Sequence, residues 1–165
     1  MLIRSAQRAD LGEIHSLIQE LAIYERALDQ AKATREQLET ALFSPEPKVF
    51  CDLVESDKGE IAGLAIWFLS YSTWTGTHGI HLEDLFVREA FRGRGYGRAL
   101  LSHLARICYE RGYHRLQWLV LDWNAPALEF YRSIGAQGLG EWTQHRVTDE
   151  ALVALAEGED RQRER

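Results

Sequence analysis

The segment Arg92-Gly93-Arg94-Gly95-Tyr96-Gly97 decides the fold of this chain, because it joins an apolar run to a strongly periodic helix. The apolar run is 82–87, and the residues after Gly97 repeat leucine and isoleucine at helical spacing. Glycines let the backbone turn tightly and approach a ligand closely, and the first N–H groups of the following helix point out of the turn. A strand, a glycine-rich turn and a helix in this order predict an anion site, and a pyrophosphate is the anion that we expect.

Two common phosphate-binding loops do not fit this segment. A P-loop requires Gly-Lys-Ser or Gly-Lys-Thr, which the segment lacks, and the third glycine of a dinucleotide-binding loop would fall on Arg98. The pattern that fits is Arg/Gln-x-x-Gly-x-Gly/Ala, present as Arg92-x-x-Gly95-x-Gly97. This pattern resembles the acyl-CoA loop of the GNAT family of N-acetyltransferases, although a surface turn before a glycine-rich helix would also produce it.

The composition fits one compact domain that does not bind nucleic acid. With 165 residues, 45% of them hydrophobic, the chain is long enough to bury about 70% of its unfolded surface. The net charge of −6 disfavours nonspecific binding to nucleic acid and favours a cationic small substrate. Because no apolar window has the length of a signal-peptide core or a membrane helix, we expect a cytoplasmic protein without membrane contact.

The cysteines and histidines do not predict a disulfide or a metal site. Cys51 lies in a strand-like run and Cys108 on the apolar face of a helix, so we expect two buried thiols. His78 and His81 are three residues apart, but they span an expected boundary between a loop and a strand. We therefore expect no metal in this protein.

Strands and helices are expected on both sides of the glycine-rich turn. The apolar patterns predict strands over 2–5, 49–55, 60–72, 80–87 and 115–121, with a weaker strand over 138–147. Capping residues predict that the helices begin at Asp10, at Thr34 with Gln37 completing a capping box, after Gly97, at Asn124 and near Thr148. We expect one domain over residues 1–157 and a disordered charged tail over 158–165.

Two further motifs strengthen the resemblance to the GNAT family. The segment His81-Leu82-Glu83-Asp84-Leu85-Phe86-Val87 resembles the central strand of that family, and Trp123-Asn124-x-Pro126 followed by Phe130-Tyr131-x-x-x-Gly135-Ala136 resembles its fourth motif. The order of the expected elements is also similar. The resemblance implies an α/β (α+β) fold in one domain, with a mixed, mostly antiparallel sheet that is splayed at the acetyl-CoA site and has helices on both faces.

Within the family, the chain most resembles the spermidine/spermine (diamine) and thialysine N-acetyltransferases. The motifs that carry this resemblance are Leu21-Ala22-x-Tyr24-Glu25, Tyr71-x-x-Trp74-x-Gly76, Leu82-Glu83-Asp84, Trp123-Asn124-x-Pro126 and Phe130-Tyr131. They imply transfer of acetyl from acetyl-CoA to a primary amine of a small cationic molecule, a polyamine or a lysine-like amino acid, by direct attack in a ternary complex. They also imply a homodimer whose sites lie at the interface.

Glu83 and Tyr131 are the expected catalytic residues. A primary amine is mostly protonated at neutral pH, so a carboxylate must take its proton before the nitrogen attacks the thioester. The resemblance assigns this step to Glu83, directly or through water, although an exposed strand carboxylate is the alternative. It assigns protonation of the leaving CoA thiolate to Tyr131, for which a core tyrosine is the alternative.

The resemblance also assigns residues to acetyl-CoA. It places Arg92 through Arg98 on the pyrophosphate, with Arg94 and Arg98 contributing mainly electrostatically. It places backbone N–H groups near Phe86 and Val87 on the oxyanion of the reaction, at an expected bulge. Asn124 either bonds the CoA arm or caps its helix.

The amine is expected to meet carboxylates and aromatic rings. Tyr24, Glu25 and Trp74 are the candidates for a cation-binding wall, and all three could instead be ordinary surface. Glu83 and Asp84 complete the set, although consecutive strand residues face opposite sides unless the strand is bulged. Because the resembling branch is dimeric, some of these residues could serve the site of the partner.

Two other functions stay open from the sequence. A catalytically silent acyl-CoA-binding module that regulates a partner would carry the same loop, but the presence of Glu83 and Tyr131 favours an enzyme. Acetylation of a protein N-terminus or lysine is disfavoured, because the acidic wall suits a small polyvalent amine. Among small amines, we favour lysine-like and other short amines over long polyamines.

Overall fold

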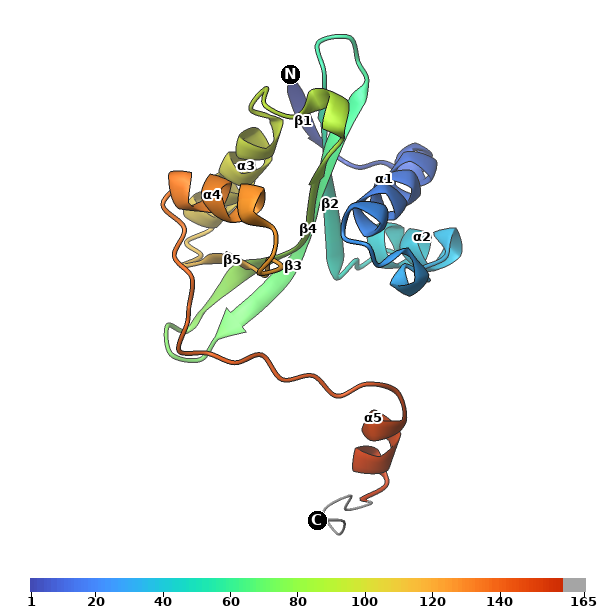
Figure 1. Cartoon of the computed structure of the whole chain (residues 1–165), viewed down its shortest axis with the longest axis vertical. Helices are drawn as coiled ribbons and strands as arrows, with labels where there is room; N and C mark the ends of the chain where they lie inside the picture. Colours follow the sequence, from blue (N-terminus) through green and yellow to red (C-terminus); the bar gives the residue numbers. More distant parts are fainter. Residues whose placement is uncertain (159–165) are drawn as a thin grey trace. The chain divides into compact units, whose positions relative to one another are not determined.

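The computed structural model describes residues 1–158, which contain a five-stranded mixed sheet (Figure 1). The chain separates into two compact units, one of residues 1–119 and one that begins at Val120. The predicted α/β (α+β) class with a mixed, mostly antiparallel sheet is confirmed. The single domain over 1–157 stays a prediction, and the predicted disordered tail lies, apart from Gly158, outside the described residues.

The sheet belongs to the first unit and opens at one edge. Its strands lie in chain order and are β1 (Leu2–Ser5), β2 (Val49–Glu55), β3 (Ile61–Ser72), β4 (Thr77–Val87) and β5 (Leu116–Trp118). The first four strands pair antiparallel, whereas β5 is parallel to β4. The β4–β5 ladder covers only Ile80–Leu82 opposite Leu116–Trp118, and β4 continues beyond it. The sheet is therefore splayed along the second half of β4, and β5 is shorter than predicted because its ladder ends there.

Helices cover both faces of the sheet (Figure 1). On one face, α1 (Leu11–Tyr24) and α2 (Arg35–Phe43) pack over alternate strand residues. The buried cluster on this face consists of Ile14, Leu17, Leu42, Cys51, Leu53, Leu64, Ile66 and Phe86. On the other face, α3 (Tyr96–Glu110) buries Leu100, Leu101, Leu104 and Cys108. Both thiols are buried and unpaired as predicted, and burial raises the pKa of Cys108 and, much more strongly, that of Cys51.

The predicted start of α1 is partly wrong. A short 3-10 turn over Arg8–Asp10 precedes the helix, and the Asp10 carboxylate does not cap α1. It accepts hydrogen bonds from the Gln7 backbone N–H at 2.7 Å and from two nitrogens of Arg4 at 2.7 and 2.9 Å. Charge-assisted bonds to a guanidinium are stronger than a cap bond, so they decide where this carboxylate points. The capping box of Thr34 and Gln37 at α2 is confirmed.

The second unit contains α4 (Ala125–Ser133) and α5 (Asp149–Ala156), whose starts agree with the prediction. The predicted strand over 138–147 is wrong, because the chain there is irregular. Gly138 and Gly140 lower its strand propensity, and none of the paired strands in residues 1–158 includes it. None of the helices in residues 1–158 has the length and apolar character that crossing a bilayer requires.

Candidate active site

The glycine-rich turn has the geometry of an anion cradle. Gly93 and Gly95 hold left-handed backbone with φ of 74° and 83°, a conformation that side chains disfavour. The space in front of both Cα atoms is open, since an added Cβ would meet no atom within 4 Å. Gly95 is the N-cap of α3, so the first N–H groups of the helix have no partner within the helix. The turn therefore has the geometry of an anion site, and its binding of a pyrophosphate stays a prediction.

The side chain of Arg92 faces the protein and not the cradle. Its Nε donates a hydrogen bond to the Val87 carbonyl at 2.9 Å, and its guanidinium lies 4.6 Å from the centre of the Tyr24 ring and 5.6 Å from that of Phe86. Its backbone N–H donates to the Glu89 carbonyl at 3.1 Å. Arg92 thus ties the turn to β4 and α1, and the backbone donors for an anion begin after it. The sequence pattern identifies this arginine but not the direction of its side chain.

A β-bulge lies at Glu83. On β3, Ile66 faces Asp84 and the next residue, Trp67, faces Leu82, so Glu83 is one extra residue in β4. A bulge was predicted near Phe86 and Val87 on the side of β5, and it occurs earlier and on the side of β3. Because of the extra residue, Glu83 and Asp84 need not face opposite sides of the sheet. Both carboxylates can therefore point to the same face and serve one site.

Three carboxylates lie close to one another on the face that α1 covers. Burial, together with the nearby charges of Glu83 and Glu25, raises the pKa of Asp84 to about 6. Burial also raises the pKa of Glu25, which follows the last residue of α1. The negative end of the α1 dipole adds to the same field. A cation would relieve the repulsion among these groups, so the cluster has the electrostatics of an ammonium site.

The backbone donors at the open edge are not the pair that was predicted. The Arg88 N–H donates to the Ala62 carbonyl on β3 at 2.9 Å, and N–H directions alternate along an antiparallel strand. The N–H of Phe86 therefore points toward β3, whereas those of Val87 and Leu85 point to the splayed side. The Val87 carbonyl also lies on that side, where it accepts from Arg92. Leu85 was missed, because only the strand register shows which N–H groups are available.

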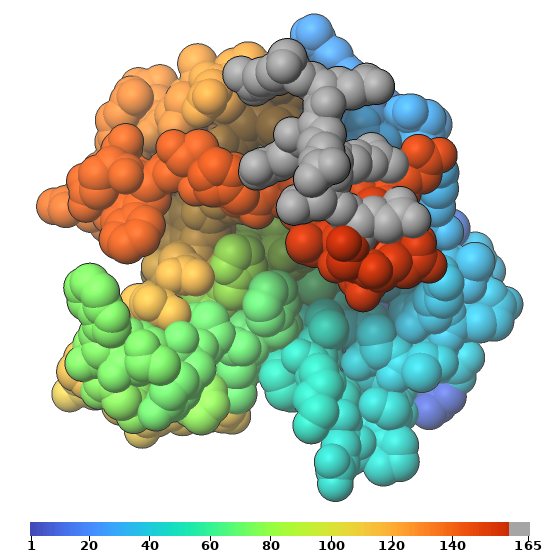
Figure 2. Space-filling model, turned by 90° about the horizontal axis from the view of Figure 1, so that it is seen from below, coloured from blue at the N-terminus to red at the C-terminus, as the bar shows by residue number. Residues whose placement is uncertain are grey.

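The structure does not bring Trp74 together with the carboxylates. Its side chain is 91% exposed in the turn of the β3–β4 hairpin, which stands at the molecular surface (Figure 2, green). Six residues separate the start of β4 at Thr77 from Glu83, a span of roughly 20 Å along an extended strand. A role for Trp74 in binding the amine stays a prediction. Tyr24, by contrast, lies under the guanidinium of Arg92, next to Glu25.

Asn124 and Tyr131 belong to the second unit. The Oδ1 atom of Asn124 accepts a hydrogen bond from the Ala127 N–H at 3.3 Å, so this residue caps α4. Its contact with the CoA arm stays a prediction. Tyr131 lies on α4 with its ring 5.4 Å from that of Phe130. Its role as the general acid also stays a prediction.

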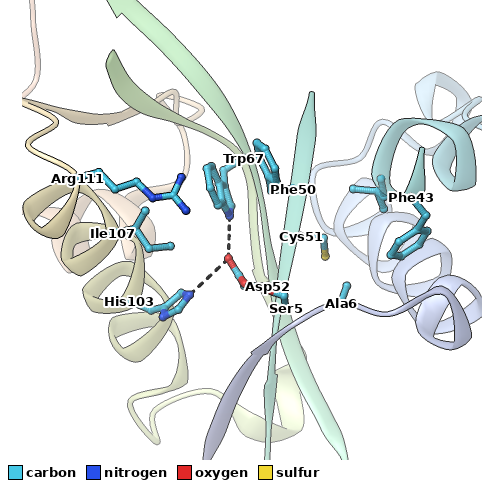
Figure 3. Close-up of a pocket in the computed structure, with 11 residues that line it drawn as sticks. Ser5, Ala6, Phe43, Phe50, Cys51, Asp52, Trp67, His103, Ile107 and Arg111 are labelled. Atoms are coloured by element: carbon cyan, nitrogen blue, oxygen red, sulfur yellow. Dashed lines mark hydrogen bonds and ion pairs between the residues drawn. The ribbon is translucent and has the colours of Figure 1, made fainter. Parts of the chain in front are cut away.

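A cavity of about 320 Å³ lies elsewhere in the first unit, around the buried Asp52 (Figure 3). The Asp52 carboxylate accepts from the Ser5 hydroxyl at 3.0 Å and from Trp67 Nε1 at 2.8 Å, and lies 3.5 Å from His103 Nε2. None of the predicted site residues lines this cavity. The Asp52 carboxylate is fully engaged by these partners, so the cluster joins β1, β2, β3 and α3 as part of the fold.

The described residues contain no group of three or more side chains that could hold a metal ion.

Comparisons with known proteins point to one family. Residues 14–136 match the acetyltransferase (GNAT) family. A thialysine N-epsilon-acetyltransferase from Bos taurus is 37% identical over 94% of this chain and 97% of its own length, and the L-ornithine N5-acetyltransferase NATA1 from Arabidopsis thaliana is 29% identical over 93% and 86%. The solved structure of an integron cassette protein from the mobile metagenome of V. cholerae aligns with a TM-score of 0.78 at 27% identity, covering 94% of this chain and 96% of that one. The chain therefore belongs to the GNAT family and is an acetyl-CoA-dependent N-acetyltransferase.

Proposed function

We propose that this enzyme acetylates the side-chain primary amine of a short cationic amino acid, of the lysine and ornithine type. The observation that carries the proposal is the gathering of Glu25, Glu83 and Asp84 on one face of the bulged β4. The relatives named for thialysine and for ornithine support the same substrate class. The amine is a cation before it reacts, so it would bind first as an ion pair to this cluster.

In the proposed reaction, Glu83 takes one proton from the bound ammonium, directly or through water. The neutral nitrogen then attacks the thioester carbonyl of acetyl-CoA, which supplies the activated acetyl group. The N–H groups of Val87 and Leu85 would hold the oxyanion that forms, since they point to the splayed side of β4. When the tetrahedral intermediate collapses, the C–S bond breaks and Tyr131 would protonate the departing thiolate, while the nitrogen loses its second proton as the amide forms and that proton restores the Tyr131 hydroxyl. The turn from Gly93 to Arg98 would hold the pyrophosphate.

An amino-acid substrate also has an α-carboxylate, which needs a cation or an N–H donor. Arg26 directly follows Glu25 and holds a left-handed backbone with φ of 60°. This conformation ends α1 in a Schellman motif, since the Ala27 N–H donates to the Ala22 carbonyl at 2.9 Å. We assign Arg26 as the candidate for the α-carboxylate. A long polyamine would present further cations here, and Arg26 would repel them.

We further propose that the protein is a cytoplasmic homodimer that acts without nucleic acid or a membrane. The acidic composition supports the absence of nucleic acid. Large apolar side chains of the second unit support an interface, because Leu139, Trp142 and Leu155 are each well over half exposed.

An amine panel tests the proposed function. The purified enzyme is incubated with acetyl-CoA and with thialysine, lysine, ornithine, putrescine or spermidine, while release of free thiol is followed and products are identified by mass. We expect the highest kcat/KM for an amino acid. A preference for spermidine by more than tenfold, about 1.4 kcal/mol in transition-state binding, would overturn the substrate class. No turnover with any of these amines would overturn the proposed function itself.

A further inference from the structure

His81 makes three contacts that the proposed mechanism does not use. Its ring stacks on Phe68 with 4.8 Å between ring centres. Its Nδ1 atom lies 3.3 Å from the side-chain Nε2 of Gln117, which β5 supplies. Its other nitrogen, Nε2, lies 3.7 Å from Oε2 of Glu83. One face and one nitrogen of this imidazole are thus engaged, and its other nitrogen lies near the proposed base.

The contact with Gln117 determines where the neutral imidazole carries its proton. The Gln117 amide presents its NH₂ group to His81 Nδ1, and because this group can only donate, Nδ1 is the acceptor in this arrangement. The single proton of the neutral ring is then on Nε2, the nitrogen nearer to Glu83. The ring therefore directs a donor toward the carboxylate.

Glu83 needs such a donor because little else restrains it. Its side chain is 58% exposed and lies on the bulge, whereas that of His81 is only 21% exposed. A mobile carboxylate spends part of its time away from the productive position, and small misplacements of a reacting group can lower a rate by up to about 100-fold. The separation of 3.7 Å exceeds a hydrogen bond, and a small rotation of the Glu83 side chain would close it.

We propose that His81, oriented by Gln117 and Phe68, is a positioning residue that holds the Glu83 carboxylate for the proton of the amine. The inference rests on the proposed function, in which Glu83 is the base. In this role His81 acts only through Glu83. The assignment extends the site from the bulge of β4 across to β5.

The first test needs no turnover. The ¹⁵N chemical shifts of the His81 ring in the free enzyme report its tautomer, and the carboxyl ¹³C shift of Glu83 reports its environment. We expect Nε2 to carry the proton, and we expect His81→Phe, which keeps an aromatic ring on Phe68, to shift the Glu83 signal. A neutral ring with its proton on Nδ1, or an unchanged Glu83 signal, would overturn the proposal. If the panel amines are not acetylated but these signals appear as expected, the proposed function fails while the contact stands.

The second test separates positioning from a structural role. We expect His81→Phe to lower kcat about 10- to 100-fold with the KM for acetyl-CoA unchanged. We expect His81→Gln, whose amide reaches near the position of Nε2, to recover most of that loss. In a Glu83→Gln background, His81→Phe should change kcat less than twofold, because the group on which it acts is gone. An equal loss in both backgrounds would overturn the proposal.

Two further variants complete the second test. Gln117→Leu removes the partner of Nδ1, so it should lower kcat less than His81→Phe does and should let the tautomer change. His114→Gln is the matched control, because His114 is an exposed histidine outside the site, and it should leave kcat unchanged. Thermal unfolding of each variant verifies that it is folded. If His81→Phe does not fold, His81→Gln keeps the proposal testable.

Discussion

At the scale of single residues, Asp84 is a carboxylate whose ionisation the fold changes strongly. Its pKa rises from 3.8 to about 6, so the folded protein binds this proton more tightly than the unfolded chain does. The resulting stabilisation is present below pH 3.8 and is lost as the pH rises through about 6. At neutral pH, Asp84 is therefore a charged group that costs stability and attracts a cation.

Replacing Asp84 with Asn should consequently stabilise the enzyme at pH 7. We expect a gain of about 1–3 kcal/mol in the free energy of unfolding, because each pKa unit corresponds to about 1.4 kcal/mol. Urea unfolding at pH 4 and pH 7 measures it, and the gain should be small at pH 4. The same variant should bind the amine more weakly. Equal stability of the wild type and the Asp84→Asn variant at pH 7 would show that the surroundings of Asp84 do not disfavour its charged form.

Tyr131 gives the second prediction at this scale. If it is the general acid, Tyr131→Phe should lower kcat by about 10² to 10⁴, because the thiolate then leaves without a proton, while the affinity for acetyl-CoA stays nearly unchanged. Steady-state kinetics and calorimetric binding of acetyl-CoA measure the two quantities. Tyr109→Phe is the control, since Tyr109 is an exposed tyrosine of α3. Near-normal turnover in Tyr131→Phe would remove this residue from the mechanism.

At the scale of elements, the start of α3 decides whether the cradle forms. Gly95→Ala should cost about 1–2 kcal/mol in stability, because a side chain disfavours φ of 83° even where the space for it is open. It should also weaken acetyl-CoA binding, since the first N–H groups of α3 would move. Gly12→Ala is the matched control: Gly12 lies in α1 with ordinary φ and open space, and this change should stabilise by about 0.5–1 kcal/mol.

The two glycine variants are compared by urea unfolding and by calorimetric titration with acetyl-CoA. If Gly95→Ala bound acetyl-CoA as tightly as the wild type and as Gly12→Ala, the cradle would not be the cofactor site.

The bulge in β4 is the other element on which the site depends. It brings Asp84 to the face that α1 covers, where an unbroken alternation would have turned it away.

At the scale of the whole molecule, the proposed homodimer is the feature to test. The mass of one chain is 18.9 kDa, so light scattering after gel filtration should give about twice this value. Replacing Trp142 and Leu155 together by Ser should shift the enzyme toward the monomer, because these exposed apolar side chains would be buried in an interface. Leu28→Ser removes an exposed leucine of the first unit and is the control. A monomeric wild-type enzyme at micromolar concentration would contradict the homodimer.

The sequence by itself determined the elements and the class of chemistry. The order of strands and helices, the glycine-rich turn and the caps of α2 and α4 depend on residues within one or two turns of each other, so a local pattern predicts them. The motifs around Glu83 and Gly95 identified the family before any contact was known. The segment 138–147 was predicted wrongly because a strand needs a partner, which a local pattern does not show.

Only the tertiary structure decided which of the predicted site residues meet. It placed the bulge at Glu83, directed the N–H of Phe86 toward β3, turned Arg92 inward and left Trp74 exposed in its hairpin. It also brought Gln117 to His81, 36 residues apart in the chain. Each of these facts depends on strand register and on packing between distant segments. A shift of one residue in the strand register reverses the direction of every later side chain and N–H group in that strand, and no local pattern contains that information.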